Sequence, residues 1–184
     1  SMNYNFSQFK KELKANEDWL VSEFGGLRTG RVSPAILDNI TVESYGAWMP
    51  IAHVAAISIE DAKTLRVAPW DNTLVKGIEK AIMAANLGVS VAPDSSGIRV
   101  SFPDLTEDRR KSLIKIVNSK LEEARIKVRQ ERDTAMTDIG AKEKAKEITE
   151  DERHKFKDDV QEMVDEANKK LEDLAEKKEA EIMS

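Results

Sequence analysis

The apolar residues of this chain change their spacing twice. Up to about residue 30, and again after residue 105, they recur every three or four positions, as in helices that bury one face. Between these segments they form short β-branched runs separated by glycine, proline and asparagine, which is typical of strands and turns. The pattern predicts a helical protein with a small strand-containing domain inserted into it.

Three long helices follow from the helical period. Ser7 is the expected N-cap of the first, Thr106 begins the second, and Thr149 with Glu152 forms a capping box before the third. The charged stretch that follows Gly140 is expected to be a frayed end or a loop. Each helix carries an apolar stripe, so a three-helix bundle is expected. The predicted ranges are 7–27, 106–140 and 149 onward.

The inserted region is predicted to be a compact β/α/β domain. Asp71 or Thr73 can cap its one short helix, and Gly88 can end that helix. One helix is too few for a doubly wound sheet, so the fold class is α+β. The strands are expected at residues 40–43, 54–59, 64–68, 89–91 and 98–102. The predicted domains are residues 1–30 with 105–184 for the bundle, and residues 31–104 for the insert.

The first boundary between these domains has a local cause. Gly30 can adopt backbone angles that are closed to other residues, and Pro34 disfavours helix at Ser33. An ordinary helix end followed by a turn would have the same punctuation. The return of the helical period at Leu105 favours instead two crossings of the chain between the domains.

Composition and charge narrow the class of protein. Charged residues make up 34% and aromatic residues 5%, as in proteins with long solvated helices. There is no cysteine, which excludes disulfides, and no apolar run long enough to span a bilayer, so we expect a cytoplasmic protein. The net charge of -5 hides an uneven distribution, because residues 106–146 carry twelve positive and eight negative side chains. A basic segment of this kind can be a binding face.

The residue types needed for catalysis are sparse. His53 and His154 lie in different predicted domains without a second ligand at zinc-site spacing. The glycines of segment 25–30 follow a helix rather than a strand and lack the ending of a phosphate-binding loop. Adjacent acidic pairs in the helices are better explained as solvated charge than as acid–base groups. The sequence therefore predicts no enzyme, no metal and no cofactor.

Basic residues of the second helix have a regular spacing. Arg125, Arg129 and Arg132 lie on one line of the helix, away from the apolar stripe, and Lys111 falls on the same line. A row of guanidinium groups can follow a nucleic-acid backbone. A solvated face paired within the helix, for example Glu122 with Arg125, explains the spacing equally well. Spacing alone leaves these two interpretations open.

A longer motif indicates a family. Residues 27–35 read Leu-Arg-Thr-Gly-Arg-Val-Ser-Pro-Ala and resemble the signature of bacterial ribosome recycling factors. The resemblance continues over nearly the whole chain without a large insertion, and it implies an L-shaped protein with a three-helix bundle, an inserted domain and a two-strand hinge. The further similar segments are 37–38, 40–43, 64–65, 69–71, 78–82, 94–99, 105–107, 109–111, 159–161 and 178–182.

The resemblance also implies a function and partners. Proteins of this family act in protein biosynthesis after translation termination, bind the large ribosomal subunit and, with elongation factor G and its GTP hydrolysis, help to split the ribosome into subunits. The energy comes from the partner GTPase, so the factor itself is not an enzyme. We therefore expect a monomer that binds ribosomal RNA and protein in the cytoplasm, without a membrane.

Site residues follow from the same resemblance. Arg129 and Arg132 match the arginine cluster of the family, which favours ribosomal RNA binding. The chain departs from the pattern at Glu131, usually apolar, and at Asp133, usually arginine, so phosphate attraction should be weaker. The predicted RNA-binding residues are Arg129, Arg132, Arg125, Lys111, Arg110, Arg28 and Arg31. The predicted hinge residues are Gly30, Arg31, Val32, Asp104, Leu105 and Thr106.

Two other functions stay open at this point. A helical adaptor would use the acidic third helix to bind a protein partner and would have no RNA role, so its binding would not depend on Arg132. An enzyme is a third interpretation, and it would require catalytic groups that the sequence does not bring together.

Overall fold

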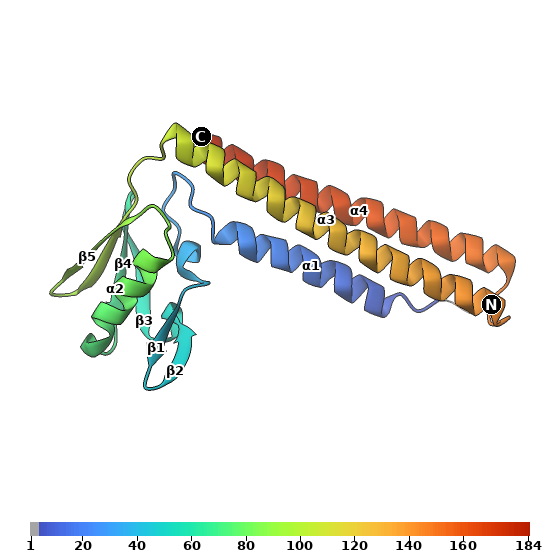
Figure 1. Ribbon diagram of the computed structural model, residues 1–184, viewed down its shortest axis with the longest axis horizontal. Coiled ribbons are helices and arrows are strands. Elements are labelled where there is room, and N and C mark those ends of the chain that lie inside the picture. The colour runs from blue at the N-terminus through green and yellow to red at the C-terminus, as the bar shows by residue number, and fades with distance from the viewer. Residues whose placement is uncertain (1–3) are drawn as a thin grey trace. The chain divides into compact units, whose positions relative to one another are not determined.

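The computed structural model describes residues 4–184, and the chain divides into two units (Figure 1). The helical unit contains residues up to Ser22 together with Lys115–Glu179, and the sheet unit contains Glu23–Ile114 together with Ala180–Ser184. Long helices and antiparallel sheets confirm the α+β class. The predicted bundle also includes residues 23–30, 105–114 and 180–184, which this division assigns to the sheet unit. It begins with residues 1–3, which lie outside the described part, so the predicted domain boundaries stay a prediction.

Three helices run side by side in the helical unit (Figure 1). They are α1 (Ser7–Gly25), α3 (Glu107–Lys144) and α4 (Glu150–Met183). With 38 residues, α3 is about 57 Å long. The predicted end of this helix at Gly140 is wrong, because the helix continues to Lys144 and a short link leads to α4.

The buried residues of this unit explain the bundle. Leu20 of α1, Val128 of α3 and Val160 of α4 are at most 1% exposed. Their spacing places each of them on an apolar stripe that the other helices cover. Burial of this apolar surface is therefore the main contribution to the stability of the bundle. One polar side chain shares this interior, because Asn16 Nδ2 donates a 2.9 Å hydrogen bond to the carbonyl of Ala124. Buried amides of this kind are satisfied by such bonds.

The helix starts follow local capping rules in two of three cases. Thr106 Oγ1 accepts from the N–H of Arg109 at 3.1 Å, and the capping box of Thr149 and Glu152 is closed by bonds of 3.1 and 3.0 Å. The prediction of Ser7 as N-cap is wrong. Asn5 Oδ1 accepts from the N–H of Ser7 at 2.9 Å, because the helical turn already begins before Ser7.

The sheet unit combines two antiparallel sheets with a short helix. One sheet is a hairpin of β1 (Thr41–Ser44) and β2 (Ala47–Pro50). The other has the strand order β3-β4-β6-β5, with β3 (Ala55–Asp61), β4 (Thr64–Pro69), β5 (Ser90–Asp94) and β6 (Gly97–Ser101). The helix is α2 (Val75–Ala84). Strand β2 was not predicted, because its sequence, Ala-Trp-Met-Pro, shows no alternation of apolar and polar residues and ends at a proline.

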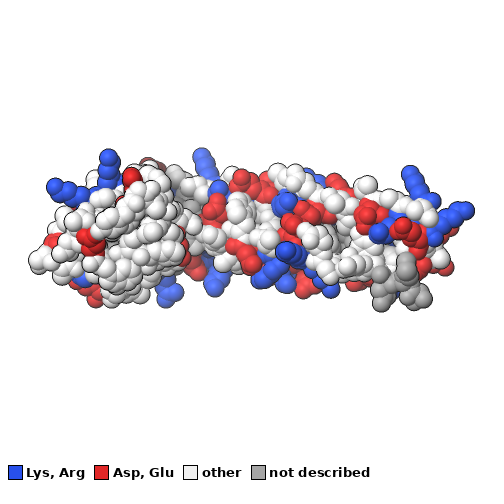
Figure 2. Space-filling view, turned by 90° about the horizontal axis from the view of Figure 1, so that it is seen from below, with Lys and Arg blue, Asp and Glu red and all other residues white. Residues whose placement is uncertain are grey.

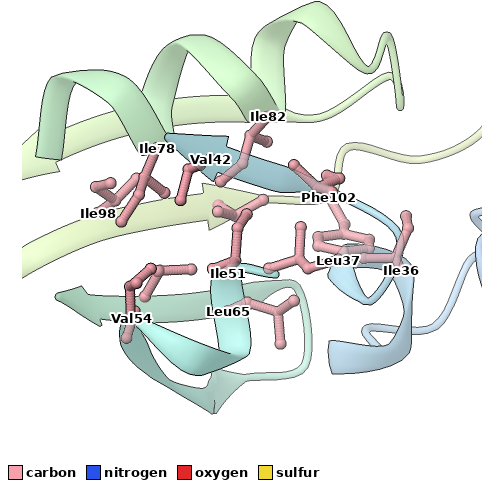
Figure 3. Close-up of a cluster of buried hydrophobic side chains, with 14 residues drawn as sticks. Ile36, Leu37, Val42, Ile51, Val54, Leu65, Ile78, Ile82, Ile98 and Phe102 are labelled. Carbon is pink, nitrogen blue, oxygen red and sulfur yellow. The ribbon is translucent and has the colours of Figure 1, made fainter. Parts of the chain in front are cut away.

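A continuous apolar core holds this unit together (Figure 3). Ile78 and Ile82 of α2 point toward the strands, where they meet Val42 and Ile98. All four side chains are at most 2% exposed. The core also contains Ile36, Leu37, Ile51, Val54, Leu65 and Phe102.

Two-residue turns connect β1 with β2, β3 with β4, and β5 with β6. Tyr45 and Gly46 both have positive φ, 50° and 83°, which matches the twist of hairpin β1–β2. Gly97 has φ of 136°, and a Cβ built there would lie 2.4 Å from the carbonyl oxygen of Val67. Only glycine fits that position. Gly30, by contrast, is not in the left-handed region, so the predicted special backbone at this boundary is wrong.

Helix α2 begins and ends differently from its sequence pattern. A short 3-10 turn, Asn72–Leu74, precedes it, and Asp71 caps that turn by accepting from the N–H of Thr73 at 2.9 Å. The helix ends at Ala84, before the expected stop at Gly88, because Asn86 already has positive φ. The prediction that Asp71 or Thr73 caps the helix itself is wrong, because the N-cap of α2 is Leu74, which makes no side-chain capping bond.

Candidate nucleic-acid interface

A groove between α3 and α4 brings together three of the predicted RNA-binding residues. Arg125, Arg129 and Arg132 lie four and three residues apart, so the helical period places them on one side of α3. Side chains of α4 form the opposite wall. The groove is lined by Arg125, Val128, Arg129, Arg132, Gln161, Val164 and Asn168.

The three arginines differ in how strongly each is paired with a carboxylate of the protein. Arg125 Nη2 makes a 2.8 Å ion pair with Glu172 Oε1 of α4, rather than the considered pair with Glu122. Arg129 is exposed and makes no ion pair among the described contacts. The side chain of Arg132 is 41% exposed, and its Nη1 is 4.0 Å from Asp133 Oδ1, a weak contact. Arg129 and Arg132 therefore retain most of their capacity to bind an anion.

The unusual carboxylates beside these arginines have different surroundings. Glu131 Oε1 pairs with Lys127 Nζ at 2.8 Å, and hydrogen bonding to this carboxylate raises the pKa of Lys127. Asp133 is 69% exposed, and its one ion-pair contact within residues 4–184 is the long one to Arg132. The charge of Glu131 is thus neutralised locally, whereas Asp133 remains able to oppose a phosphate.

The other four predicted RNA-binding residues belong to the sheet unit. Lys111 Nζ is 3.7 Å from Glu107 Oε1, and Arg110 Nε donates to the carbonyl of Ile182 at 3.2 Å. Arg31 is exposed. These three can reach solvent, and their RNA contacts stay a prediction.

Arg28 is buried, unlike the other predicted RNA-binding residues. It is 4% exposed, lies over the ring of Phe102 at 5.5 Å, and its Nη1 donates to the carbonyl of Gly88 at 2.8 Å. Burial first, and then the neighbouring charge of Arg109, lower the pKa of Arg28. In this conformation its guanidinium supports the loop before β5 and is covered from a phosphate.

The predicted hinge residues have ordinary contacts. Asp104 forms an ion pair with Lys63, which holds the pKa of the carboxyl group below its usual value, and Leu105 is buried. Val32 packs against the core of the sheet unit, and Thr106 caps α3. Movement at these positions is not tested by the structure, so the hinge remains a prediction.

The α4 side of the groove was not predicted from the sequence. Gln161, Val164 and Asn168 lie three and four residues apart, a spacing that places them on one face of a helix. This spacing is a signal within the chain, but it adjoins the apolar stripe of α4 and by itself indicates no ligand. Their position beside α3 depends on how the helices pack.

Charge over the molecule does not identify the site by itself. Figure 2 shows positive and negative side chains interspersed along the helical unit on the face that it presents. Among residues 4–184, no three His, Asp or Glu side chains are grouped to hold a metal ion. None of the described helices combines the length and apolarity required to cross a membrane. The groove is a candidate site because of the arginines that line it, and the charge distribution seen over the surface in Figure 2 does not single it out.

Comparison with known proteins identifies the family. A family model described as ribosome recycling factor matches residues 20–183. The chain belongs to the ribosome recycling factor family. Similar proteins include the ribosome-recycling factor of Endomicrobium trichonymphae, 42% identical over 97% of this chain and 96% of that protein. The factor of Finegoldia magna is 43% identical over 96% of this chain and 97% of its own length.

Solved structures agree with this family assignment. A solution structure of a ribosome recycling factor superposes with a TM-score of 0.76 at 35% identity, covering 97% of this chain and 95% of the other. A second structure describes the factor of T. thermophilus and the elongation factor G of E. coli bound to the E. coli post-termination complex. Its TM-score is 0.67 at 35% identity, with 97% of each chain covered. Family membership confirms the expectation of a non-enzymatic, ribosome-associated factor.

Proposed function

We propose that this protein recycles ribosomes after translation termination. It binds the large ribosomal subunit and, together with elongation factor G and GTP, promotes splitting of the post-termination complex into subunits. Family membership over residues 20–183 supports this function. A structural relative with 35% identity is described on a post-termination complex together with elongation factor G, which supports the same partners. The cytoplasm, where bacterial ribosomes work, is the expected location.

The groove of α3 and α4 carries the RNA-binding part of the proposal. Arg129 is exposed and Arg132 has one weak carboxylate contact, so both can donate to phosphate oxygens. Two guanidinium groups three residues apart on a helix fit successive acceptors of a ribosomal RNA backbone. Lys111, Arg110 and Arg31 are further candidates for phosphate contacts.

Movement of the sheet unit is the second part of the proposal. Residues 30–32 and 104–106 are the expected hinge strands, and two short crossings would permit rotation while limiting separation. A push by the partner GTPase on the small domain would then be transmitted to the subunit contacts. The protein contributes binding and geometry, and the partner contributes the energy of GTP hydrolysis.

A salt series of binding to purified large ribosomal subunits tests the RNA contact. For Arg129→Ala we expect weaker binding and a slope of log affinity against log salt that is smaller by about one, because one phosphate contact is lost. Lys155, which is exposed on α4 outside the groove, provides the control Lys155→Ala. This control should retain the wild-type slope.

Splitting of post-termination complexes is measured in parallel by light scattering, with elongation factor G and GTP present. Arg129→Ala should split ribosomes more slowly at subsaturating protein concentration. Binding that ignores both salt and Arg129 would contradict the proposal. It would favour instead an adaptor that docks on a protein through the acidic helix α4.

A further inference from the structure

The groove contains one polar atom that phosphate cannot satisfy. Asn168 Oδ1 and Arg132 Nε are both buried and have no hydrogen-bond partner in the described part of the chain. Both side chains line the same groove. A buried polar atom without a partner is unfavourable, so such atoms indicate a missing ligand or water.

The chemistry of the two atoms restricts that ligand. Arg132 Nε is a donor, and an anionic oxygen can accept from it. Asn168 Oδ1 is an acceptor and requires a donor, which an ionised phosphate diester does not have. A ribose 2′-hydroxyl both donates and accepts, and it is the group that distinguishes RNA from DNA.

Two polar side chains that line the groove with Asn168 form hydrogen bonds with other residues. Gln161 Nε2 donates to Asp165 Oδ1 at 2.9 Å, and Arg125 Nη2 is held by Glu172 at 2.8 Å. Val128 and Val164 supply the apolar wall of the groove and are at most 4% exposed. A sugar ring can pack on such a wall, and its hydroxyl can reach Asn168 Oδ1, which is closed to solvent in this structure, once the amide turns toward the groove.

We propose that this groove is a ribose–phosphate site, in which Asn168 Oδ1 accepts a hydrogen bond from a 2′-hydroxyl while Arg129 and Arg132 bind adjacent phosphate oxygens. Asn168 is then the residue that selects RNA over DNA. The inference rests on the proposed binding of ribosomal RNA, and it adds a second helix and a sugar contact to it.

Substitution of Asn168 by leucine separates the sugar contact from the phosphate contacts. Asn168→Leu should bind large ribosomal subunits roughly threefold to tenfold more weakly at every salt concentration, because it loses one hydrogen bond. Its salt slope should equal that of the wild type, because no phosphate contact is lost. Gln130→Leu, an exposed amide of α3 outside the groove, is the matched control and should bind as the wild type.

Competition by oligonucleotides tests the sugar directly. An RNA hairpin and a DNA hairpin of the same sequence are used to displace the wild type and Asn168→Leu from large subunits. RNA should compete better than DNA against the wild type, and this preference should shrink by the same threefold to tenfold factor in Asn168→Leu. Thermal unfolding of both proteins, followed by circular dichroism, checks that the variant is folded.

The outcomes distinguish a failure of the ribose site from a failure of the proposed function on which it rests. Salt-dependent binding that is equal in wild type and Asn168→Leu, or an unchanged preference for RNA, would overturn the ribose site and leave the proposed function intact. Loss of salt slope in Asn168→Leu would also overturn it, since the residue would then act through phosphate. Absence of binding by the wild type would overturn both.

Discussion

The sheet unit and the helical unit are built on different principles. In the sheet unit, short strands and one helix converge on a single core that includes Ile78 and Ile98, both fully buried. In the helical unit, apolar residues are spread along three stripes on long helices. Figure 2 shows mostly uncharged atoms over the sheet unit and mixed charge along the helices on the face that it presents. Stability is therefore concentrated in one unit and distributed in the other.

Their exposed charges differ in the same way. In the sheet unit, Arg66 Nη2 forms ion pairs with two carboxylates, at 3.0 Å from Glu60 Oε1 and 2.9 Å from Asp94 Oδ2. In the groove of the helical unit, Arg129 and Arg132 have no comparable partners among the described residues. Paired charge stabilises a surface locally, whereas incompletely paired charge in a groove is available to a ligand. The contrast is between a paired arginine in the sheet unit and two arginines in the groove of the helical unit that keep most of their capacity to bind an anion.

A substitution in the centre of the sheet core should have the largest effect on stability. Ile78→Ala removes a side chain that is 0% exposed and should lower the free energy of unfolding by about 2–5 kcal/mol. Urea unfolding, with hydrogen exchange of the β4 and β6 amides, measures the loss. Met83→Ala, on the same helix but 63% exposed, should change stability by less than about 0.5 kcal/mol. Equal losses would contradict a concentrated core.

Loss of a helix cap in the helical unit should have a smaller effect. Thr149→Ala removes the acceptor for the N–H of Glu152, a 3.1 Å bond, and should cost about 0.5–2 kcal/mol. The thermal unfolding midpoint measured by circular dichroism should fall accordingly. The exposed Thr137 within α3 supplies the control Thr137→Ala, which should not lower the midpoint. A loss as large as that of Ile78→Ala would remove the contrast between the units.

Acid should reveal the paired charges of the sheet unit. Hydrogen bonding from Arg66, and then from the N–H of Ser96, holds the pKa of Asp94 well below its ordinary value of 3.8. Stability from this ionised carboxylate is therefore present above about pH 4 and is lost as the pH falls toward the lowered pKa.

The Asp94→Asn variant tests this pH dependence. It should be less stable than the wild type at pH 7, and its free energy of unfolding should fall less steeply below about pH 4 because one titrating group is missing. Urea unfolding at a series of pH values measures both slopes. Identical slopes for the two proteins would show that the ion pair does not contribute to acid sensitivity.

Local pattern was enough to predict much of this protein. The helical and strand periods, the capping box at Thr149 and the spacing of Arg125, Arg129 and Arg132 depend on neighbours within a few residues, so they can be read directly from the chain. The long motif at residues 27–35 indicates the family in the same way, because its residues are contiguous.

Contacts between distant segments required the folded structure. The pairing of Arg125 with Glu172, the burial of Arg28 over Phe102 and the place of Asn168 beside α3 join residues far apart in the chain. Spacing within one helix cannot indicate which side chain of another helix will lie opposite, because packing of whole stripes decides that register. Helical period therefore predicted one wall of the groove, and tertiary packing supplied the other.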